Sequence, residues 1–161
     1  MKKYKLTTDT KMWLGRKLFR IQALINFGDV KKGDLGGYIE KEDNLSHNDK
    51  AWVYGDALVY GDALVYGSAW VYGNAQVCGN AWVYGNADYL CFKGLGSCNR
   101  NTTFYKTKDN SISVVCGCFN GTLDEFAAKV RDTHGDSKYA KEYLAAIEVV
   151  KIHFDLGDHN E

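Results

Sequence analysis

Two glycine-containing turns in the last third of the chain carry the side chains best suited to binding an anion. The first lies in GLGSCNRNTT, residues 94–103, and the second in CFNGT, residues 118–122, which opens onto a helical pattern. Free N–H groups at a helix N-terminus and a bidentate arginine both bind phosphate. The candidate ligand-binding residues are Ser97, Asn99, Arg100, Thr102, Thr103, Asn120, Gly121 and Thr122. The alternative is ordinary turn and cap chemistry, and the sequence has neither a P-loop nor a dinucleotide fingerprint.

His47 is the candidate general base if the protein is an acyltransferase, because histidine is the residue that most often fills that role. It falls at a position that is valine in the regular six-residue repeats that follow. A capping role for His47 is the favoured alternative. Outside the acyltransferase case we assign no catalytic residue, because the repeats have no insertion that would hold an acceptor substrate.

The cysteines were considered as metal ligands. Cys116 and Cys118 lie two apart on an expected strand, and Cys91 and Cys98 could approach them. Structural zinc sites favour CxxC-like spacings, which are absent here. We therefore expect free thiols, no metal site and no cofactor.

Six consecutive hexads form the middle of the chain. From residue 51 the sequence reads AWVYGD, ALVYGD, ALVYGS, AWVYGN, AQVCGN and AWVYGN. Ala and Val lie two apart and so point to the same side of a short extended segment. Gly followed by Asp, Ser or Asn makes a corner. Three such sides closing a triangle give an 18-residue coil, and coils stack at the ~4.8 Å spacing of neighbouring strands.

This pattern resembles the hexapeptide-repeat family, in which an aliphatic residue is followed four places later by a small one. The matching pairs are Val53/Ala57, Val59/Ala63, Val65/Ala69, Val71/Ala75 and Val77/Ala81. The resemblance covers about residues 39–91 and implies a left-handed β-helix. That fold hosts acyltransferases as well as inert scaffolds. The preceding ALINFGDVKKGDLGGYIE resembles the N-terminal cap of YdcK-type hexapeptide proteins, a group assigned as acetyltransferases.

The expected fold is mainly β, a short left-handed parallel β-helix of about three coils with a small C-terminal α+β module. The expected domains are an N-terminal cap over 1–38, the β-helix over 39–91 and the module over 92–161. Strands are expected at 89–93, 102–107 and 111–116, followed by two helices. The first helix begins at the capping-box pair Thr122 and Glu125, and the second runs to about Ile152.

An 18-residue coil stacks large aromatic side chains on the outside of the walls. Trp52 lies under Trp70 and Leu64 under Trp82 in this register. Such ladders expose more apolar surface than a monomer tolerates. Either the C-terminal segment folds over one face or copies associate, and we expect a homo-oligomer, a trimer in the usual form of this fold. The expected interface residues are Trp52, Tyr54, Tyr66, Trp70, Tyr72, Trp82 and Tyr84.

The net charge of zero conceals an uneven distribution. Residues 1–35 hold nine Lys and Arg against three Asp, 9 − 3 = +6, and residues 36–88 hold two Lys against seven acids, 2 − 7 = −5. Nucleic acid is not an expected partner, because overall neutrality and acidic coils oppose phosphate neutralisation. No apolar run approaches the ~20 residues that span a bilayer. With no secretory signal, we expect a cytoplasmic location.

The favoured function is that of a non-catalytic oligomeric binding protein that sequesters a small anionic, nucleotide-type ligand. The segments GS-x-NR, TFY and CGCF-x-GT resemble parts of short phage and bacterial proteins with similar hexads. That resemblance implies a phage-encoded immune-evasion sponge. The alternatives are a CoA-dependent acetyltransferase with His47 as base and a structural or protein-interaction scaffold.

Overall fold

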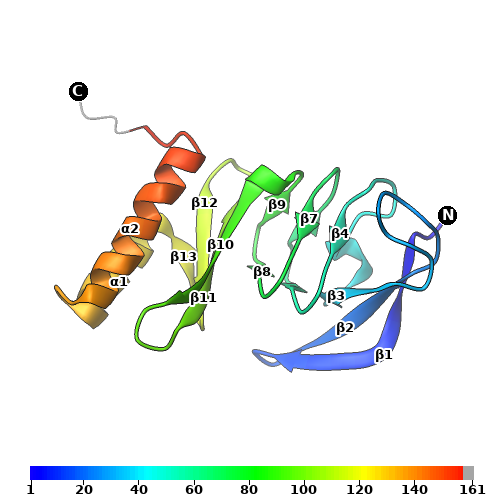
Figure 1. The fold of residues 1–161 in the computed structure, drawn as a ribbon, viewed down its shortest axis with the longest axis horizontal. Coiled ribbons are helices and arrows are strands. Elements are labelled where there is room, and N and C mark those ends of the chain that lie inside the picture. The colour runs from blue at the N-terminus through cyan, green and yellow to red at the C-terminus, as the bar shows by residue number, and fades with distance from the viewer. Residues whose placement is uncertain (158–161) are drawn as a thin grey trace.

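The structure is a computed structural model that describes residues 1–157, and the molecule is elongated (Figure 1). An N-terminal hairpin lies at one end, the short strands of the hexads form the middle, and a sheet with two helices forms the other end. Among residues 1–157 no helix is both long and apolar enough to cross a bilayer. Residues 158–161, which end the expected module, fall outside the described residues.

The first elements are antiparallel strands, whereas the sequence predicts only a cap over 1–38. Strands β1 (Tyr4–Trp13) and β2 (Arg16–Ala23) form a hairpin, and β2 pairs antiparallel with β3 (Leu35–Ile39). The turn consists of Leu14 and Gly15, with φ angles of 47° and 77°, as tight hairpin loops require. Because β3 pairs in parallel with a hexad strand, the hairpin extends one wall of the repeat segment.

Each hexad contributes one two-residue strand. These strands are β4 (Trp52–Val53), β5 (Leu58–Val59), β6 (Leu64–Val65), β7 (Trp70–Val71), β8 (Gln76–Val77) and β9 (Trp82–Val83). Each pairs in parallel with the strand three hexads later, β4 with β7, β5 with β8 and β6 with β9. Trp52 faces Trp70, a separation of 70 − 52 = 18 residues. The predicted 18-residue register is confirmed.

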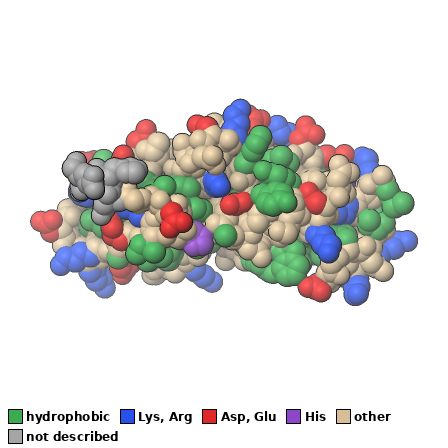
Figure 2. Space-filling model, turned by 90° about the horizontal axis from the view of Figure 1, so that it is seen from above, with side chains coloured by type: hydrophobic (Ala, Val, Ile, Leu, Met, Phe, Trp, Pro, Cys, Tyr) green, Lys and Arg blue, Asp and Glu red, His purple; other side chains and the backbone are tan. Residues whose placement is uncertain are grey.

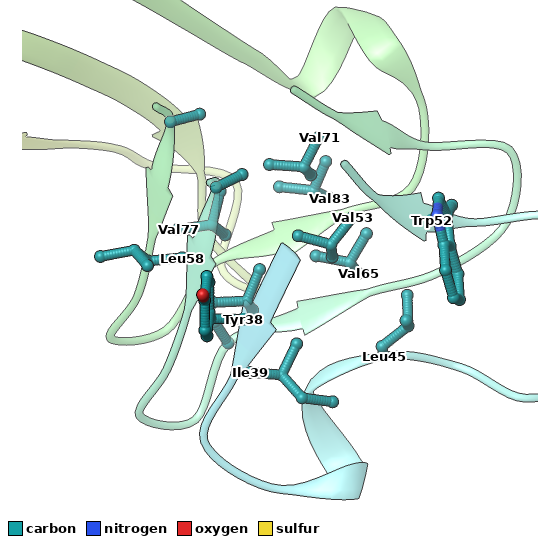
Figure 3. Packing of buried hydrophobic residues seen from close by; sticks show 14 of the residues in the cluster. Tyr38, Ile39, Leu45, Trp52, Val53, Leu58, Val65, Val71, Val77 and Val83 are labelled. Atoms are coloured by element: carbon teal, nitrogen blue, oxygen red, sulfur yellow. The ribbon is translucent and has the colours of Figure 1, made fainter. Parts of the chain in front are cut away.

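The interior is filled by the Val and Ala side chains of the hexads, all of which are buried. Figure 3 shows Val53, Val65, Val71 and Val83 converging in the space between the walls, whereas Trp52 lies on the outer side of its strand. The corners are made by glycines with positive φ, such as Gly67 at 67°. A Cβ at Gly67 would come within 2.5 Å of the Tyr84 ring in the next coil, so close stacking also requires glycine there.

The first coil is two residues longer than the regular ones. Leu45 bridges to Val65, a separation of 65 − 45 = 20 residues, and Tyr38 pairs with Leu58 at the same offset. The extra residues fall in the loop 46–50, between Leu45 and β4. The expectation that His47 occupies a valine position was therefore wrong: Leu45 takes that position, and His47 lies in the longer loop.

At the N-terminal end, side chains close the first coil mainly by donating hydrogen bonds. Lys3 is only 1% exposed, and its Nζ donates to the carbonyl oxygens of Asp49 (3.0 Å) and Ala51 (2.7 Å). The buried Asn44, at the end of the 3₁₀ turn η1 (Glu42–Asn44), donates to the carbonyls of Gly61 and Ala63. Burial lowers the pKa of Lys3 to about 8, although Asp49 partly opposes the shift.

At the C-terminal end, mainly neutral oxygen atoms accept hydrogen bonds from the N–H groups of the last coils. Asn86, in the 3₁₀ turn η2 (Asn86–Asp88), accepts from Trp70 N (2.7 Å), and the Tyr89 hydroxyl accepts from Tyr72 N (3.2 Å). Thr103 Oγ1 accepts from Gln76 N at 3.1 Å. The end of the repeat is thus sealed by the segment that follows it.

The C-terminal module has one strand more than the sequence predicts. Its elements are β10 (Tyr89–Leu95), β11 (Arg100–Lys106), β12 (Ile112–Cys116), β13 (Phe119–Thr122), α1 (Leu123–His134) and α2 (Lys138–His153). The antiparallel sheet has the order β10-β11-β12-β13. On β11 the side chains alternate: Phe104 packs with the helices, whereas Tyr105 packs with the hexads.

The aromatic ladders are covered only in part. Trp52 is buried, in edge contact with Tyr4 and Phe27 of the N-terminal segment. The module packs on the C-terminal end of the hexads, where Gln76 and Cys78 of the wall that ends in β8 are buried. By contrast, Tyr72, Trp82 and Tyr84 are 46%, 42% and 58% exposed. Figure 2 shows hydrophobic side chains gathered over the middle of the molecule on the face in view.

Candidate functional site

A cavity of about 320 Å³ lies in the C-terminal module, where two turns of the sheet meet α1 and α2. Side chains of three kinds line it, together with Ser97, Val130 and Thr133. The basic ones are Arg100, Lys129 and His134. The aromatic ones are Phe119, Phe126 and Tyr143. The thiols are Cys98, Cys116 and Cys118. No carboxylate is among its lining residues within 1–157, so the cavity favours a negatively charged guest.

Arg100 is positioned by the turn that joins β10 to β11. Leu95 pairs with Arg100, and the turn between them contains Asn99 in a left-handed conformation with φ of 49°. The Arg100 guanidinium lies over Gly117 in the β12–β13 turn, where an added Cβ would collide with its Nη1 atom. The two turns are therefore in contact through the arginine. The side chain remains exposed to solvent and free to meet an anion.

Tyr143 of α2 attaches the helix layer to the same turn. Its hydroxyl donates to the carbonyl oxygen of Leu95 (3.2 Å) and accepts from Cys116 Sγ (3.7 Å). Its ring lies against Gly96, which has no side chain to displace it. Burial raises the pKa of Tyr143 far above its ordinary value, so the hydroxyl stays protonated.

Helix α1 supplies the opposite side of the cavity. Phe126 and Val130 are buried against the sheet, and Lys129 lies beside them on the solvent side. His134, at the last turn, stacks on Tyr143 with ring centroids 5.8 Å apart. The helix thus brings one cation and one imidazole to the cavity together with apolar surface.

Cys98 is an exposed thiol whose pKa lies below its ordinary value. The Ser97 hydroxyl, with its Oγ 3.8 Å from Cys98 Sγ, and the Arg100 guanidinium lower the pKa of this thiol. In return, Cys98 raises the pKa of Arg100. Burial instead raises the pKa of Cys78 and of Cys91.

The candidate ligand residues do not all meet at this cavity. Ser97 and Arg100 line it, whereas Asn99 belongs to the turn and does not. Thr102 and Thr103 are buried: Thr102 donates to Cys116 Sγ, and Thr103 donates to Cys91 Sγ.

The residues before α1 are also engaged elsewhere. Asn120 accepts from the Tyr105 hydroxyl and donates to Cys78 Sγ at the end of the hexads. Gly121 lies in β13. Thr122 Oγ1 accepts from Glu125 N (3.1 Å) while Glu125 Oε2 accepts from Thr122 N (3.0 Å), which confirms the predicted capping box. The helix N-terminus is therefore closed by its own side chains.

Of the residues that line the cavity, the sequence predicts only Ser97 and Arg100 as ligand-binding residues. Lys129, His134, Phe126 and Tyr143 come from the two helices, which the sequence predicts only as a packing layer, and Phe119 comes from β13. A signal for them exists in the helical period, because Phe126, Val130 and Thr133 follow at steps of four and three. No pattern in the sequence indicates that the β10–β11 turn lies against this face of α1.

His47 lies in the loop 46–50 at the N-terminal end of the hexads, where it lines an open hollow with Glu42, Asp49 and Tyr66. Its Nδ1 accepts the backbone N–H of Lys3 (3.1 Å), and its ring stacks on Tyr4 with centroids 4.1 Å apart. The Nδ1 lone pair is thus occupied, and the neutral ring carries its proton on Nε2, 3.8 Å from Glu42. Burial is the largest of the effects that lower the pKa of His47.

Over residues 1–157 no three His, Cys, Asp or Glu side chains converge as a metal site.

The family comparison concerns the hexads alone. Residues 59–73 and 75–87 match the model of the YdcK β-solenoid repeat. No curated protein matches the chain. The matched residues contribute β6, β7, β8 and β9 with the edges of β5 and η2, and none of them lines the cavity. The repeat segment is therefore similar to a β-solenoid, and the chemistry of the cavity must be argued from its own residues.

Proposed function

We propose that the protein is a non-catalytic binding protein that holds a small anionic, nucleotide-type ligand in the cavity of the C-terminal module. The observation that carries the proposal is the composition of that cavity, in which Arg100, Lys129 and His134 surround aromatic side chains without a carboxylate. Its volume of about 320 Å³ lies at the lower end of the usual range for small-molecule sites. A mononucleotide suits this size better than a dinucleotide.

In the proposed complex the phosphate lies at the mouth and the base lies inside. The Arg100 guanidinium offers parallel N–H donors that match two oxygens of a phosphate. Lys129 adds a second positive charge from the helix side. The base packs on Phe119 and Phe126, whose faces supply apolar surface and offset stacking.

The rival acetyltransferase function is disfavoured by the state of its candidate base. A general base needs a free lone pair directed at the substrate. The Nδ1 atom of His47 accepts the Lys3 N–H, so the lone pair of the neutral ring is occupied. Sequestration of an intact ligand is the function we favour, and an immune-evasion sponge is one form of it.

The finer features of the architecture belong to the same proposal. We propose that the hexads wind with a left hand into about three coils, and that copies associate as a homotrimer. The exposed Tyr72, Trp82 and Tyr84 support association, because each is a large ring left open to solvent, with Tyr72 stacked on Tyr54 and Tyr84 packed on Tyr66 of the coil below. Light scattering that finds only a species of 18.1 kDa would remove the trimer and leave the binding cavity untouched.

Isothermal titration calorimetry with adenosine monophosphate, inorganic phosphate and acetyl-CoA tests the binding function. We expect the nucleotide to bind, and Arg100→Ala to weaken binding by roughly tenfold or more, since a charge-assisted pair contributes about 1.5–3 kcal/mol. Lys93→Ala is the matched control, because Lys93 is an exposed cation on β10 outside the cavity. The nucleotide should be recovered unchanged after the protein is denatured.

Two results would overturn the proposal. One is an equal loss of affinity in Arg100→Ala and Lys93→Ala, which would mean a general charge effect. The other is release of CoA from acetyl-CoA in the presence of a simple amine, which would establish the acetyltransferase. A protein that binds none of these probes would favour the scaffold.

A further inference from the structure

A groove of about 510 Å³ lies between α1 and α2, separate from the cavity described above. Its floor is apolar, formed by the half-buried Leu123, Ala127 and Leu144 and by the exposed Ala145. Ile152, which is 77% exposed, lines an adjoining hollow and continues this surface toward the end of α2. No residue that lines the groove also lines the cavity, so the proposed binding function leaves this face of the helices unused.

The two helices lie antiparallel along the groove. Phe126 of α1 contacts Tyr143 of α2 with ring centroids 5.5 Å apart, and His134 contacts Tyr139 with centroids 6.0 Å apart. Later residues of α1 therefore lie beside earlier residues of α2. The short connection 135–137 between the helices gives the same order.

Because of this order, the charged side chains of the groove are separated by sign. Arg131 and Lys141 line one end, and Asp124 and Glu148 line the other. Lys151 also lies at the second end, where it pairs with Glu148 at 3.2 Å. The formal charges are thus +2 at one end and −2 + 1 = −1 at the other. On each helix the two opposite charges are seven residues apart, 131 − 124 and 148 − 141, which places both on one face.

We propose that this groove is an interface with a second copy of the same chain, related by a two-fold axis through the middle of the groove. Such an interface must be self-complementary, because the same patch contributes both sides. The axis places Lys141 of each copy against Glu148 of the other, and the apolar floors meet between these pairs, where burial removes them from water.

The distribution of charge favours a second copy over a partner of uniform charge. An acidic partner would be repelled at the Asp124 end of the groove, and a basic partner at the Arg131 end. A copy turned through the two-fold axis meets an opposite charge at both ends.

This contact is independent of the two earlier proposals. It uses the helices, whereas the proposed trimer uses the exposed rings of the hexads and the proposed ligand uses the cavity. The helix contact alone gives a dimer, and both contacts together give a hexamer. In either case, loss of the helix contact halves the mass of the assembly.

Sedimentation velocity of the full-length protein over a range of concentrations tests the contact. We expect an even-numbered assembly for wild type, and half its mass for Lys141→Glu and for Glu148→Lys. Each reversal sets like charges against each other twice in a two-fold contact, which should raise its Kd by roughly tenfold or more. Lys93→Glu makes the same charge change as Lys141→Glu at an exposed position of β10 outside the groove, and it should leave the mass unchanged. Circular dichroism confirms that each variant is folded.

An equimolar mixture of Lys141→Glu and Glu148→Lys separates a direct contact from a general effect of charge. In a mixed pair the two reversed residues face each other at one end and the two native residues at the other, so attraction returns at both. We expect the mixture to recover the mass of wild type.

A wild type that is monomeric or only trimeric would overturn the inference, as would an equal loss of mass in Lys93→Glu or a mixture that stays at half mass. Recovery of the mass in the mixture of a protein that binds no nucleotide would reject the proposed function and retain the interface. Nucleotide binding by a protein that stays monomeric would do the reverse.

Discussion

At the N-terminal end of the hexads the open coil is closed by a buried ammonium and an amide, whereas at the C-terminal end it is closed largely by hydroxyl and amide oxygens. Both ends face the same requirement, because buried backbone groups need partners. The cation at Lys3 carries a desolvation cost that the neutral Thr103 and Tyr89 hydroxyl groups do not. The comparison indicates that the N-terminal cap is the more sensitive to substitution and to pH.

The largest expected effect is at Lys3. Lys3→Met keeps the length of the side chain but leaves the Asp49 and Ala51 carbonyls without their donor. We expect the free energy of unfolding to fall by about 3 kcal/mol. Urea unfolding followed by tryptophan fluorescence measures it. Lys5→Met, at an exposed position of β1 two residues later, is the control and should change stability by less than about 0.5 kcal/mol.

Asn44→Ala should have the next largest effect. The amide donates to two carbonyls of the first coil and accepts the N–H of Lys41 at 2.9 Å. Its removal should cost about 2 kcal/mol, measured in the same unfolding assay. The exposed Asn48→Ala is its control. An equal loss in both variants would mean that the loop, and not the buried amide, carries the stability.

At the opposite end, Tyr105→Phe should cost only about 1 kcal/mol. The Tyr105 hydroxyl lies 3.5 Å from Cys78 Sγ and donates to Asn120 at 3.3 Å. Without it, Asn120 still donates to Cys78. The exposed Tyr84→Phe serves as the reference. A loss at Tyr105 as large as that at Lys3 would remove the contrast between the two ends.

The smallest expected effect is a pH dependence confined to the N-terminal cap. Burial, together with Lys3, Lys2 and the terminal amine, lowers the pKa of His47 below its ordinary 6.5, while Glu42 opposes the shift. The unfolded chain therefore binds the proton more readily, and the stability that His47 contributes is complete above pH 6.5 and lost as the pH falls through its folded pKa. Protonated Nδ1 can no longer accept the Lys3 N–H.

The pH prediction is checked by unfolding wild type and His47→Gln at about pH 7.5 and about pH 5. Wild type should lose more stability on acidification than the variant does. Hydrogen exchange should locate the loss in β1 and the loop 46–50. A loss that instead appears in the C-terminal module would contradict the assignment to His47.

The register of the hexads could be predicted because every hexad repeats the same pattern of residue types. Val on the inside, a large residue on the outside and Gly at the corner leave one way to stack Trp52 under Trp70. The two-residue insertion before β4 could not be predicted in the same way. Ile39 and Leu45 are spaced by six residues, so the change of phase appears only when Leu45 is seen against Val65.

The candidate site was predictable only where local sequence decides the structure. The Thr122 and Glu125 cap is local and was predicted, and Arg100 could be singled out by its chemistry. The cavity itself depends on which turn packs against α1, a long-range contact that no local pattern encodes. The sequence predicts a turn at β13 because Asn120 and Gly121 are typical turn residues, but pairing with β12 makes them extended.

The identical pairing of successive coils makes the length of the molecule adjustable in fixed steps. Duplicating residues 51–68 would add one coil and move the hairpin and the cavity apart by about 4.8 Å while both seals keep their contacts. Adding a single hexad would instead rotate the module by about a third of a turn relative to the hairpin. The number of hexads therefore sets both the distance and the direction between the two ends, and only whole coils change the distance while they keep the direction.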